Sequence, residues 1–302
     1  MTLRFGLFGT GHWAAQTQAA GLDGHPDVEF VGVWGRDPDK AGALARRHGA
    51  RPFADAGELI EAVDAVAIAL PPDVQAPLAT RAAEAGRHLL LDKPVALDLD
   101  AADRLAGAVR EAGVASLVFV TNRYRPEIEV FLDQMAATGG WCGAQVALLG
   151  SIFEPAGPYG GSAWRRRWGG LWDVGPHALS ILTPVLGPVV GVTAMHGPHD
   201  TVHAILRHPA AVSTMSVTVN APPGLNVQGT LFYGESGAVR LPKPESEPVQ
   251  AFRTAVARLA GNVAAGTPAD PLDVRCGRDA VAVLAAVQAS ADGGGVAQEV
   301  CY

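Results

Sequence analysis

The segment LRFGLFGTGHWA, residues 3–14, decides the fold of this 302-residue chain. Its first six residues form a short apolar run of the kind found in strands that are buried on both faces of a sheet. A Gly9-x-Gly11-x-x-Ala14 pattern follows at once and opens a helical pattern. In that context Gly9 permits a tight turn, Gly11 lets a pyrophosphate approach the backbone and Ala14 allows close helix packing. The segment predicts a dinucleotide-binding turn, with an ordinary glycine turn as the alternative.

The residues downstream of this turn repeat the alternation of strand and helix. Asp37-Pro38 and Pro72-Asp73 supply helix-start signals. Alternation of this kind implies a parallel, doubly wound sheet, so residues 1–121 are predicted to form a Rossmann domain. Short apolar runs predict its further strands at residues 28–34, 65–70, 88–91 and 115–120, and Ala-rich amphipathic stretches predict its helices at residues 12–21, 38–48, 74–85 and 98–112.

The pattern changes after about residue 121. Helices are predicted near residues 125–137 and 171–186, followed by runs of alternating polarity that are typical of antiparallel strands with one solvated face. Residues 122–302 are predicted to form a second α/β domain for substrate binding and oligomerisation, and a closing helix at residues 274–290 could pack back on the first domain. The alternating runs lie at residues 201–207, 212–219 and 227–233.

Composition and charge exclude several classes of function. A hydrophobic content of 48% with only 18% charged residues is typical of a well-buried globular protein, and a net charge of −7 argues against a nucleic-acid partner. The three cysteines have no CxxC spacing, so neither a disulfide framework nor a metal site is expected. No apolar run approaches the roughly 20 residues of a membrane span, and the chain begins directly in a strand pattern rather than a signal peptide. A cytoplasmic location without a membrane partner is therefore expected.

The end of the strand at residues 28–34 bears on which cofactor binds. An NAD enzyme usually offers a carboxylate there to the ribose hydroxyls, but this chain has Gly35-Arg36-Asp37. A guanidinium at Arg36 suits a 2′-phosphate, so NADP(H) is predicted to be preferred, with NAD(H) possible. A solvated loop charge is the alternative for Arg36, and Asp37 could either cap the next helix or reach back to the ribose.

Two further segments follow strands of the predicted sheet. Leu70-Pro71-Pro72-Asp73 is a rigid turn that would lie against the nicotinamide side of a dinucleotide. Asp92-Lys93-Pro94 follows the strand at residues 88–91, and ligands of open parallel sheets bind beyond the carboxyl ends of the strands. A lysine there can hydrogen-bond a hydroxyl or carbonyl oxygen of a substrate, although an isolated lysine at a strand end is usually solvated.

A carboxylate and an imidazole lie four residues apart in GGLWDVGPH, residues 169–177. On a helix Asp173 and His177 would share one face, where the carboxylate could orient the imidazole and adjust its pKa toward neutrality. The alternative is a helix cap at Asp173 and a core histidine at residue 177. The three glycines of the segment favour a site, because they let the backbone approach something bulky.

Taken together, these segments resemble the Gfo/Idh/MocA oxidoreductase family over essentially the whole chain. The resemblance implies a Rossmann domain followed by an α/β domain with a large, mostly antiparallel sheet that often forms a subunit interface. It also implies that Lys93 contacts the reacting oxygen, that His177 donates or accepts the proton, and that Asp173 binds and orients the substrate. The residues expected to bind the cofactor are Gly9, Thr10, Gly11, His12, Trp13, Gly35, Arg36, Asp37, Leu70, Pro71, Pro72, Gln75, Asp92, Lys93, Pro94, Asn122, Arg123, Trp164 and Arg165.

Two positions depart from the family pattern. Asp92 stands where the family usually has a glutamate before Lys-Pro, and Gln75 stands near a position where a histidine is frequent. A shorter carboxylate at residue 92 could alter the position of Lys93. Neither departure removes Lys93 or His177.

The expected function is NAD(P)-dependent hydride transfer at a hydroxyl or keto carbon of a sugar, cyclitol or related polyol, in a homo-oligomer (dimer or tetramer). One alternative is a reductase or dehydrogenase of a non-sugar substrate such as a dihydrodiol, imine or tetrapyrrole, since the Trp164–Trp168 segment could line a pocket for an acidic or aromatic ligand. A second alternative is a catalytically silent NAD(P)-sensing regulatory protein, which the presence of both Lys93 and His177 disfavours.

Overall fold

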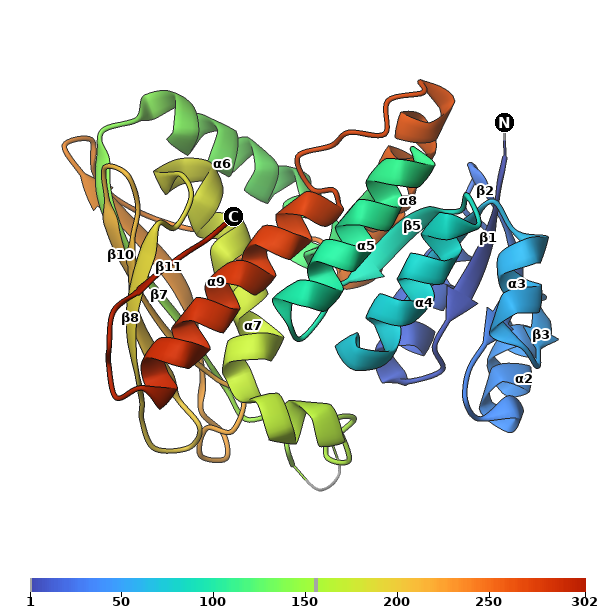
Figure 1. The fold of residues 1–302 in the computed structure, drawn as a ribbon, viewed down its shortest axis with the longest axis horizontal. Coiled ribbons are helices and arrows are strands. Elements are labelled where there is room, and N and C mark those ends of the chain that lie inside the picture. The colour runs from blue at the N-terminus through green and yellow to red at the C-terminus, as the bar shows by residue number, and fades with distance from the viewer. Residues whose placement is uncertain (1, 155–156) are drawn as a thin grey trace. The chain divides into compact units, whose positions relative to one another are not determined.

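The computed structural model describes residues 2–154 and 157–302. These form two compact units, shown as a ribbon in Figure 1. The first unit comprises residues 1–125 and 246–278, and the second comprises residues 126–245 and 279–302. Residues 246–278, which the sequence analysis assigned to the second domain, thus join the first unit. The predicted division at residue 121 stays a prediction.

The first unit contains a six-stranded parallel sheet with the strand order β3-β2-β1-β4-β5-β6. Its inner strands are buried on both faces, as their unbroken apolar runs predict; every side chain of β4 is fully buried. The predicted doubly wound sheet is thereby confirmed. The strands are β1 (Leu3–Phe8), β2 (Val28–Trp34), β3 (Arg51–Phe53), β4 (Ala65–Ile68), β5 (His88–Asp92) and β6 (Ser116–Phe119).

The helices of this unit follow the predicted positions with two additions and one change of type. The first helix contains a π-helical segment, and the short elements β3 and α3 and the long α8 were not predicted from the sequence. The helical elements are the π-helix Ala14–Ala19, α1 (Ala20–Leu22), α2 (Pro38–Arg47), α3 (Ala56–Ala62), α4 (Pro72–Glu84), α5 (Leu99–Ala112), a 3₁₀ turn (Thr121–Tyr124), α8 (Pro248–Ala264) and the start of α9 (Val274–Asp292).

Helix α8 returns to the first unit late in the chain and is anchored there by apolar and polar contacts. Phe252 packs edge-on against Phe119 of β6, with ring centroids 5.1 Å apart. The guanidinium of Arg253 donates to the backbone carbonyls of Gly21, Asp23 and Gly24 at 3.0–3.2 Å. These contacts hold the C-terminal end of α1.

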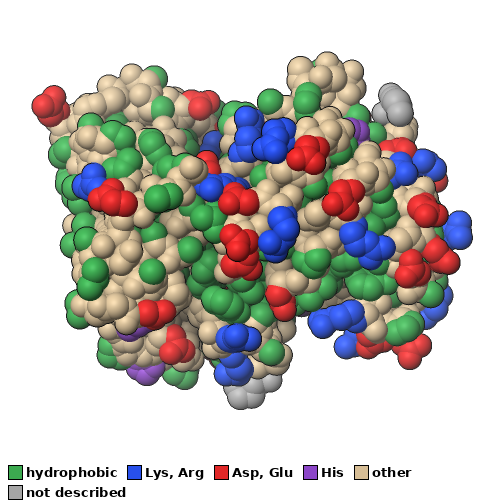
Figure 2. Space-filling view, in the orientation of Figure 1, with side chains coloured by type: hydrophobic (Ala, Val, Ile, Leu, Met, Phe, Trp, Pro, Cys, Tyr) green, Lys and Arg blue, Asp and Glu red, His purple; other side chains and the backbone are tan. Residues whose placement is uncertain are grey.

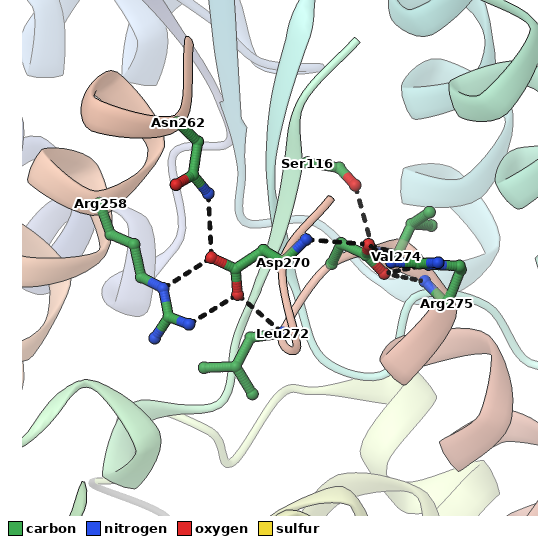
Figure 3. A network of polar contacts seen from close by, with 8 residues as sticks. Ser116, Arg258, Asn262, Asp270, Leu272, Val274 and Arg275 are labelled. Atoms are coloured by element: carbon green, nitrogen blue, oxygen red, sulfur yellow. Dashed lines mark hydrogen bonds and ion pairs between the residues drawn. The ribbon is translucent and has the colours of Figure 1, made fainter. Parts of the chain in front are cut away.

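A buried carboxylate fastens the loop after α8 (Figure 3). Asp270 accepts hydrogen bonds from Arg258 Nε at 2.7 Å, Arg258 Nη2 at 2.8 Å and Asn262 Nδ2 at 2.9 Å. Its Oδ1 also accepts from the Leu272 backbone N–H at 2.8 Å. Burial alone would raise the pKa of Asp270, but the Arg258 guanidinium and these hydrogen bonds hold it below the usual range.

The second unit contains a seven-stranded sheet with the order β12-β11-β7-β10-β9-β8-β13. Only the β7–β10 pair is parallel, so the sheet is mixed and mostly antiparallel, as expected. Helix α7 packs on β7 and β10, and α6 packs on α7. The elements are α6 (Pro126–Thr138), β7 (Trp141–Gly150), α7 (Ala163–Leu186), β8 (Gly191–His196), β9 (Val202–Arg207), β10 (Val212–Thr218), β11 (Asn226–Gly234), β12 (Gly237–Arg240), the remainder of α9 and β13 (Gln298–Glu299).

Strand β7 lies in the interior of this sheet although the sequence analysis did not predict it. Its glycines and alanines give little strand signal. The structure shows why Gly143 is needed there, because a Cβ at this position would lie 2.5 Å from the Tyr233 hydroxyl and 2.6 Å from the Val212 carbonyl oxygen. Atoms of the neighbouring strands therefore occupy the space that a side chain at residue 143 would need.

On the face drawn in Figure 2, acidic and basic side chains are interspersed rather than gathered by sign. Within the described part of the chain, no helix is both long and apolar enough to cross a membrane.

Candidate active site

Three of the predicted site segments lie at one edge of the parallel sheet. Strands β1, β4 and β5 are neighbours, and the glycine turn, the Pro71-Pro72 turn and Lys93 follow their carboxyl ends in that order. The chain winds in opposite directions on the two sides of the β1–β4 pair, which is where ligands bind in sheets of this topology. The structure thus brings these segments to the expected edge.

The glycine turn has the geometry that its sequence predicts. Gly9 has a φ of +131°, and a Cβ there would lie 2.5 Å from the Ala69 carbonyl oxygen, so only glycine fits. Gly11 is exposed, and no atom lies within 4 Å of the position that a Cβ would occupy there, which leaves room for a ligand against the backbone. Ala14 is buried and packs under Gly9. The turn therefore fits a pyrophosphate at a helix N-terminus.

Residues 35–37, which follow β2, were predicted to bind the cofactor, with a helix cap as a second possible role for Asp37. A Cβ at Gly35 would lie 2.6 Å from Cγ2 of Thr10, so this position does not accept an acidic side chain unless Thr10 moves. Asp37 caps α2: its Oδ1 accepts from the backbone N–H groups of Asp39 and Lys40, both at 3.1 Å. These hydrogen bonds lower the pKa of Asp37. Of its two predicted roles, the structure shows the helix cap. Arg36 is exposed.

Gln75, which was predicted to bind the cofactor, braces the turn that carries Lys93. Its side chain is fully buried in α4. Its Nε2 donates to the carbonyl oxygens of Asp92 at 2.8 Å and Pro94 at 3.1 Å, and its Oε1 accepts from the Asp92 N–H at 2.9 Å. Because the amide uses both its donor and its acceptor on backbone groups, its observed role is to hold the end of β5.

The turn itself is further ordered by Asp92. Its Oδ1 accepts from the Lys93 N–H at 2.8 Å, and the Lys93–Pro94 peptide is cis. Lys93 is half-buried and Pro94 is buried. The shorter carboxylate at residue 92 is therefore accommodated by a bond to the backbone of the next residue.

The remaining cofactor candidates of the first unit surround this edge. Trp13 stacks on Phe119 with ring centroids 6.3 Å apart, and His12 is exposed. Asn122 and Arg123 are half-buried in the 3₁₀ turn after β6. The aromatic packing of Trp13, Phe119 and Phe252 of α8 was not predicted from the sequence.

Asp173 and His177 lie on α7 in the second unit, one helical turn apart as predicted. Asp173 is buried and His177 is half-buried. Asp173 Oδ2 accepts from Arg165 Nε at 2.9 Å, a contact that sequence spacing did not predict. The helix is interrupted at Gly169, which has a φ of +64° and a ψ of −165°.

The glycines of this segment approach protein rather than open space. A Cβ at Gly170 would lie 2.4 Å from the Thr218 Cα of β10, and one at Gly175 would lie 2.7 Å from a methyl of Leu284. The bulky neighbours inferred from the sequence are therefore a strand and helix α9. They hold α7 close to the sheet.

Arginine side chains lie over aromatic rings just before the break in α7. The Arg165 guanidinium lies 4.5 Å from the ring centroids of both Tyr159 and Trp164. Arg166 lies 4.4 Å from the Phe153 ring and donates to the Gly160 carbonyl. Across residues 2–154 and 157–302, no group of three or more His, Cys, Asp and Glu side chains could hold a metal ion.

Comparison with known proteins finds similarity over the residues that form this edge. Residues 3–120 match the family model for the oxidoreductase family, NAD-binding Rossmann fold, GFO_IDH_MocA. A dTDP-3,4-didehydro-2,6-dideoxy-alpha-D-glucose 3-reductase of Streptomyces antibioticus is 28% identical over 62% of this chain and 57% of its own length. An inositol 2-dehydrogenase of Rhizobium meliloti is 32% identical over 42% of this chain and 38% of its own length. The matches thus span less than two thirds of either relative.

The fold similarity extends over the whole chain. The WlbA dehydrogenase from Bordetella pertussis, solved in complex with NADH and UDP-GlcNAcA, superposes with a TM-score of 0.86. The alignment covers 100% of both chains at 25% sequence identity.

Proposed function

We propose that this chain, whose residues 3–120 match the Gfo/Idh/MocA oxidoreductase family, transfers hydride between a nicotinamide cofactor and a hydroxyl or keto carbon of a sugar, cyclitol or related polyol. The observation that carries the proposal is the alignment of the Gly9–Ala14 turn, the Pro71-Pro72 turn and Lys93 along three adjacent strand ends. The two curated relatives act on a cyclitol and on a dTDP-linked sugar, which supports this substrate class.

The glycine turn is proposed to hold the dinucleotide, since open space over Gly11 fits a pyrophosphate. When bound, the nicotinamide ring supplies the acceptor or donor of the hydride. NADP(H) is the preferred form in this proposal. It is supported by the exposed guanidinium of Arg36 and by the Thr10 methyl, which occupies the space that a carboxylate at residue 35 would need.

Lys93 and His177 are proposed to handle charge and the proton. The Lys93 ammonium stabilises negative charge on the reacting oxygen, and the His177 imidazole accepts the hydroxyl proton in oxidation and returns it in reduction. Asp173 binds and orients the substrate through its carboxylate. Helix α7 supports His177 locally, since Ser180 Oγ donates to the His177 carbonyl at 2.8 Å.

An acidic substrate is the second candidate, favoured by the arginine and aromatic side chains at residues 153–168. The relative structure with UDP-GlcNAcA contains an acidic sugar nucleotide, and the Arg165-Arg166-Arg167 run is the densest basic stretch of this acidic chain. Guanidinium groups bind carboxylate and phosphate through paired hydrogen bonds.

We also propose a homo-oligomer formed through the open face of the seven-stranded sheet. In β9 the side chains alternate strictly between buried and exposed. Ile205 is 53% exposed and pairs in register with Thr193 and Thr214, while Met195 and Val212 nearby are 59% and 47% exposed. A second copy could cover these exposed apolar side chains.

The proposed activity is tested by a screen of reduced-cofactor formation and consumption. Both NAD(H) and NADP(H) are offered with neutral sugars, cyclitols, keto-sugars, uronic acids and sugar nucleotides. Turnover that requires a hydroxyl or keto carbon in one of these classes supports the proposal. Cofactor binding without turnover on any member of the panel would favour a silent sensor instead.

A further inference from the structure

The largely buried ion pair between Arg165 and Asp173 is a polar contact of the second unit that the proposed mechanism does not use. Arg165 Nε donates to Asp173 Oδ2 at 2.9 Å, and the two side chains are only 19% and 8% exposed. A buried charge pair is unlike the solvated pairs on a protein surface, because removal of one partner leaves the other without compensation.

The backbone break at Gly169 makes this pair possible. In a continuous helix, residues 165 and 173 would be separated by a rise of about 12 Å. That exceeds what the Nε of an arginine and a carboxylate can bridge. Gly169 adopts a φ of +64° and a ψ of −165°, a combination that is essentially restricted to glycine, and the chain on its N-terminal side turns back toward Asp173.

The arginine is itself held in place by its surroundings. Its guanidinium lies 4.5 Å from the ring centroids of Tyr159 and Trp164, and its Nη1 lies 3.4 Å from Ser162 Oγ. Two aromatic faces restrict the guanidinium more than solvent would and strengthen its electrostatic interactions. Arg165 is therefore pre-organised to fix the position of one carboxylate oxygen.

We propose that Arg165 is a positioning residue that keeps Asp173 an anionic hydrogen-bond acceptor for substrate hydroxyls, and that Gly169 is the backbone element that builds this arrangement. The inference rests on the proposed function, because it takes Asp173 as the substrate-orienting group. A positive charge at 2.9 Å favours the ionised carboxylate. Asp173 then accepts hydrogen bonds and does not donate a proton, which leaves proton transfer to His177.

The first test needs no substrate. Thermal unfolding is measured for the wild type, Arg165→Gln, Asp173→Asn and the double variant. If the two side chains are paired, the unfolding midpoint of the double variant falls by less than the sum of the decreases in the two single variants. The expected difference is about 2–4 °C. Additive losses would overturn the proposal, whatever the protein catalyses. Arg166→Gln is the matched control, since Arg166 is exposed and contacts the Gly160 carbonyl instead.

The second test uses the substrate found by the panel screen and separates positioning from cofactor binding. Arg165→Gln is expected to lower kcat/KM about tenfold or more. NAD(P)H affinity should stay unchanged, and the variant that combines Arg165→Gln with Asp173→Asn should be no slower than Asp173→Asn alone. Arg165→Lys should restore part of the activity, and Gly169→Ala should reproduce the Arg165→Gln defect.

Two outcomes contradict the positioning role in different ways. A tenfold loss of NAD(P)H affinity in Arg165→Gln, with Asp173→Asn unaffected, would make Arg165 a cofactor ligand. Full activity of Asp173→Asn, together with non-additive unfolding midpoints, would show that the Arg165–Asp173 pair has only a structural role. That result would count against the proposed role of Asp173.

Discussion

The amide of Gln75 and the backbone of Asp92 form a reciprocal pair of hydrogen bonds, at 2.8 Å from Nε2 to the carbonyl oxygen and 2.9 Å from the N–H to Oε1. This pair ties the first turn of α4 to the end of β5. Because Lys93 is the next residue, the position of its ammonium depends on a side chain that never needs to touch the substrate.

Gln75→Leu is therefore expected to lower both stability and activity. The substitution keeps the volume but removes three hydrogen bonds to the backbone of Asp92 and Pro94, at a cost of about 2–3 kcal/mol in the free energy of unfolding. Denaturant unfolding and kcat/KM measure the two effects. Gln134→Leu on α6 is the control, because that side chain is exposed. Equal behaviour of the two variants would show that the bracing contact has no consequence.

Arg36→Ala should reduce the preference for NADP(H). Loss of the guanidinium removes a partner for the 2′-phosphate, so the dissociation constant for NADPH should rise by about tenfold while that for NADH changes little. Fluorescence titration of both cofactors checks this. The preference would be refuted if the wild type bound NADH as tightly as NADPH, or if Arg36→Ala lowered the affinity for both cofactors equally.

Asp270→Asn should destabilise the protein by about 1–3 kcal/mol at neutral pH, because the Arg258 guanidinium loses its charged partner. The native pKa of Asp270 is depressed, so its stabilisation is present above the unfolded value of about 3.9 and is lost as pH falls through the native value. The difference in the free energy of unfolding between wild type and variant should thus be constant near neutral pH and should shrink toward zero in acid. Urea midpoints recorded from neutral to acid pH test this, and a gap that stays constant in acid would contradict it.

Ile205→Asp should weaken the proposed oligomer without unfolding the subunit. The side chain is 53% exposed on the open sheet face, so a carboxylate costs little in the separate subunit but is buried on association. Light scattering at micromolar concentration should give a multiple of the 31.2 kDa chain mass for the wild type and a lower mass for the variant. A monomeric wild type would rule out this interface.

The parallel sheet could be predicted from sequence because its strands are buried on both faces and read as unbroken apolar runs. The strands of the second unit were predicted where polarity alternates, as in β9, and missed where glycine and alanine dilute the signal, as in β7. Helix α8 carried a readable signal, with buried apolar residues recurring at helical spacing from Ala251 to Leu259. Its return to the first unit depends on tertiary packing that local patterns do not record.

The site followed the same division between local and long-range information. The glycine turn and the Asp173–His177 spacing are local, and the structure shows both as predicted. The bracing role of Gln75 and the Arg165–Asp173 pair are not local, since each depends on how a turn or a helix break directs the chain. Without the backbone angles of Gly169, a separation of eight residues on a helix predicts no contact.

The most direct test of the proposed activity is the pH dependence of turnover for the wild type, Lys93→Ala and His177→Ala on the substrate found by the screen. Each variant should lower kcat by about 10²-fold or more while NAD(P)H affinity changes little, and the wild-type profile should contain an ionisation that is absent from His177→Ala. Wild-type rates in both variants, with an unchanged pH profile, would contradict the roles proposed for Lys93 and His177.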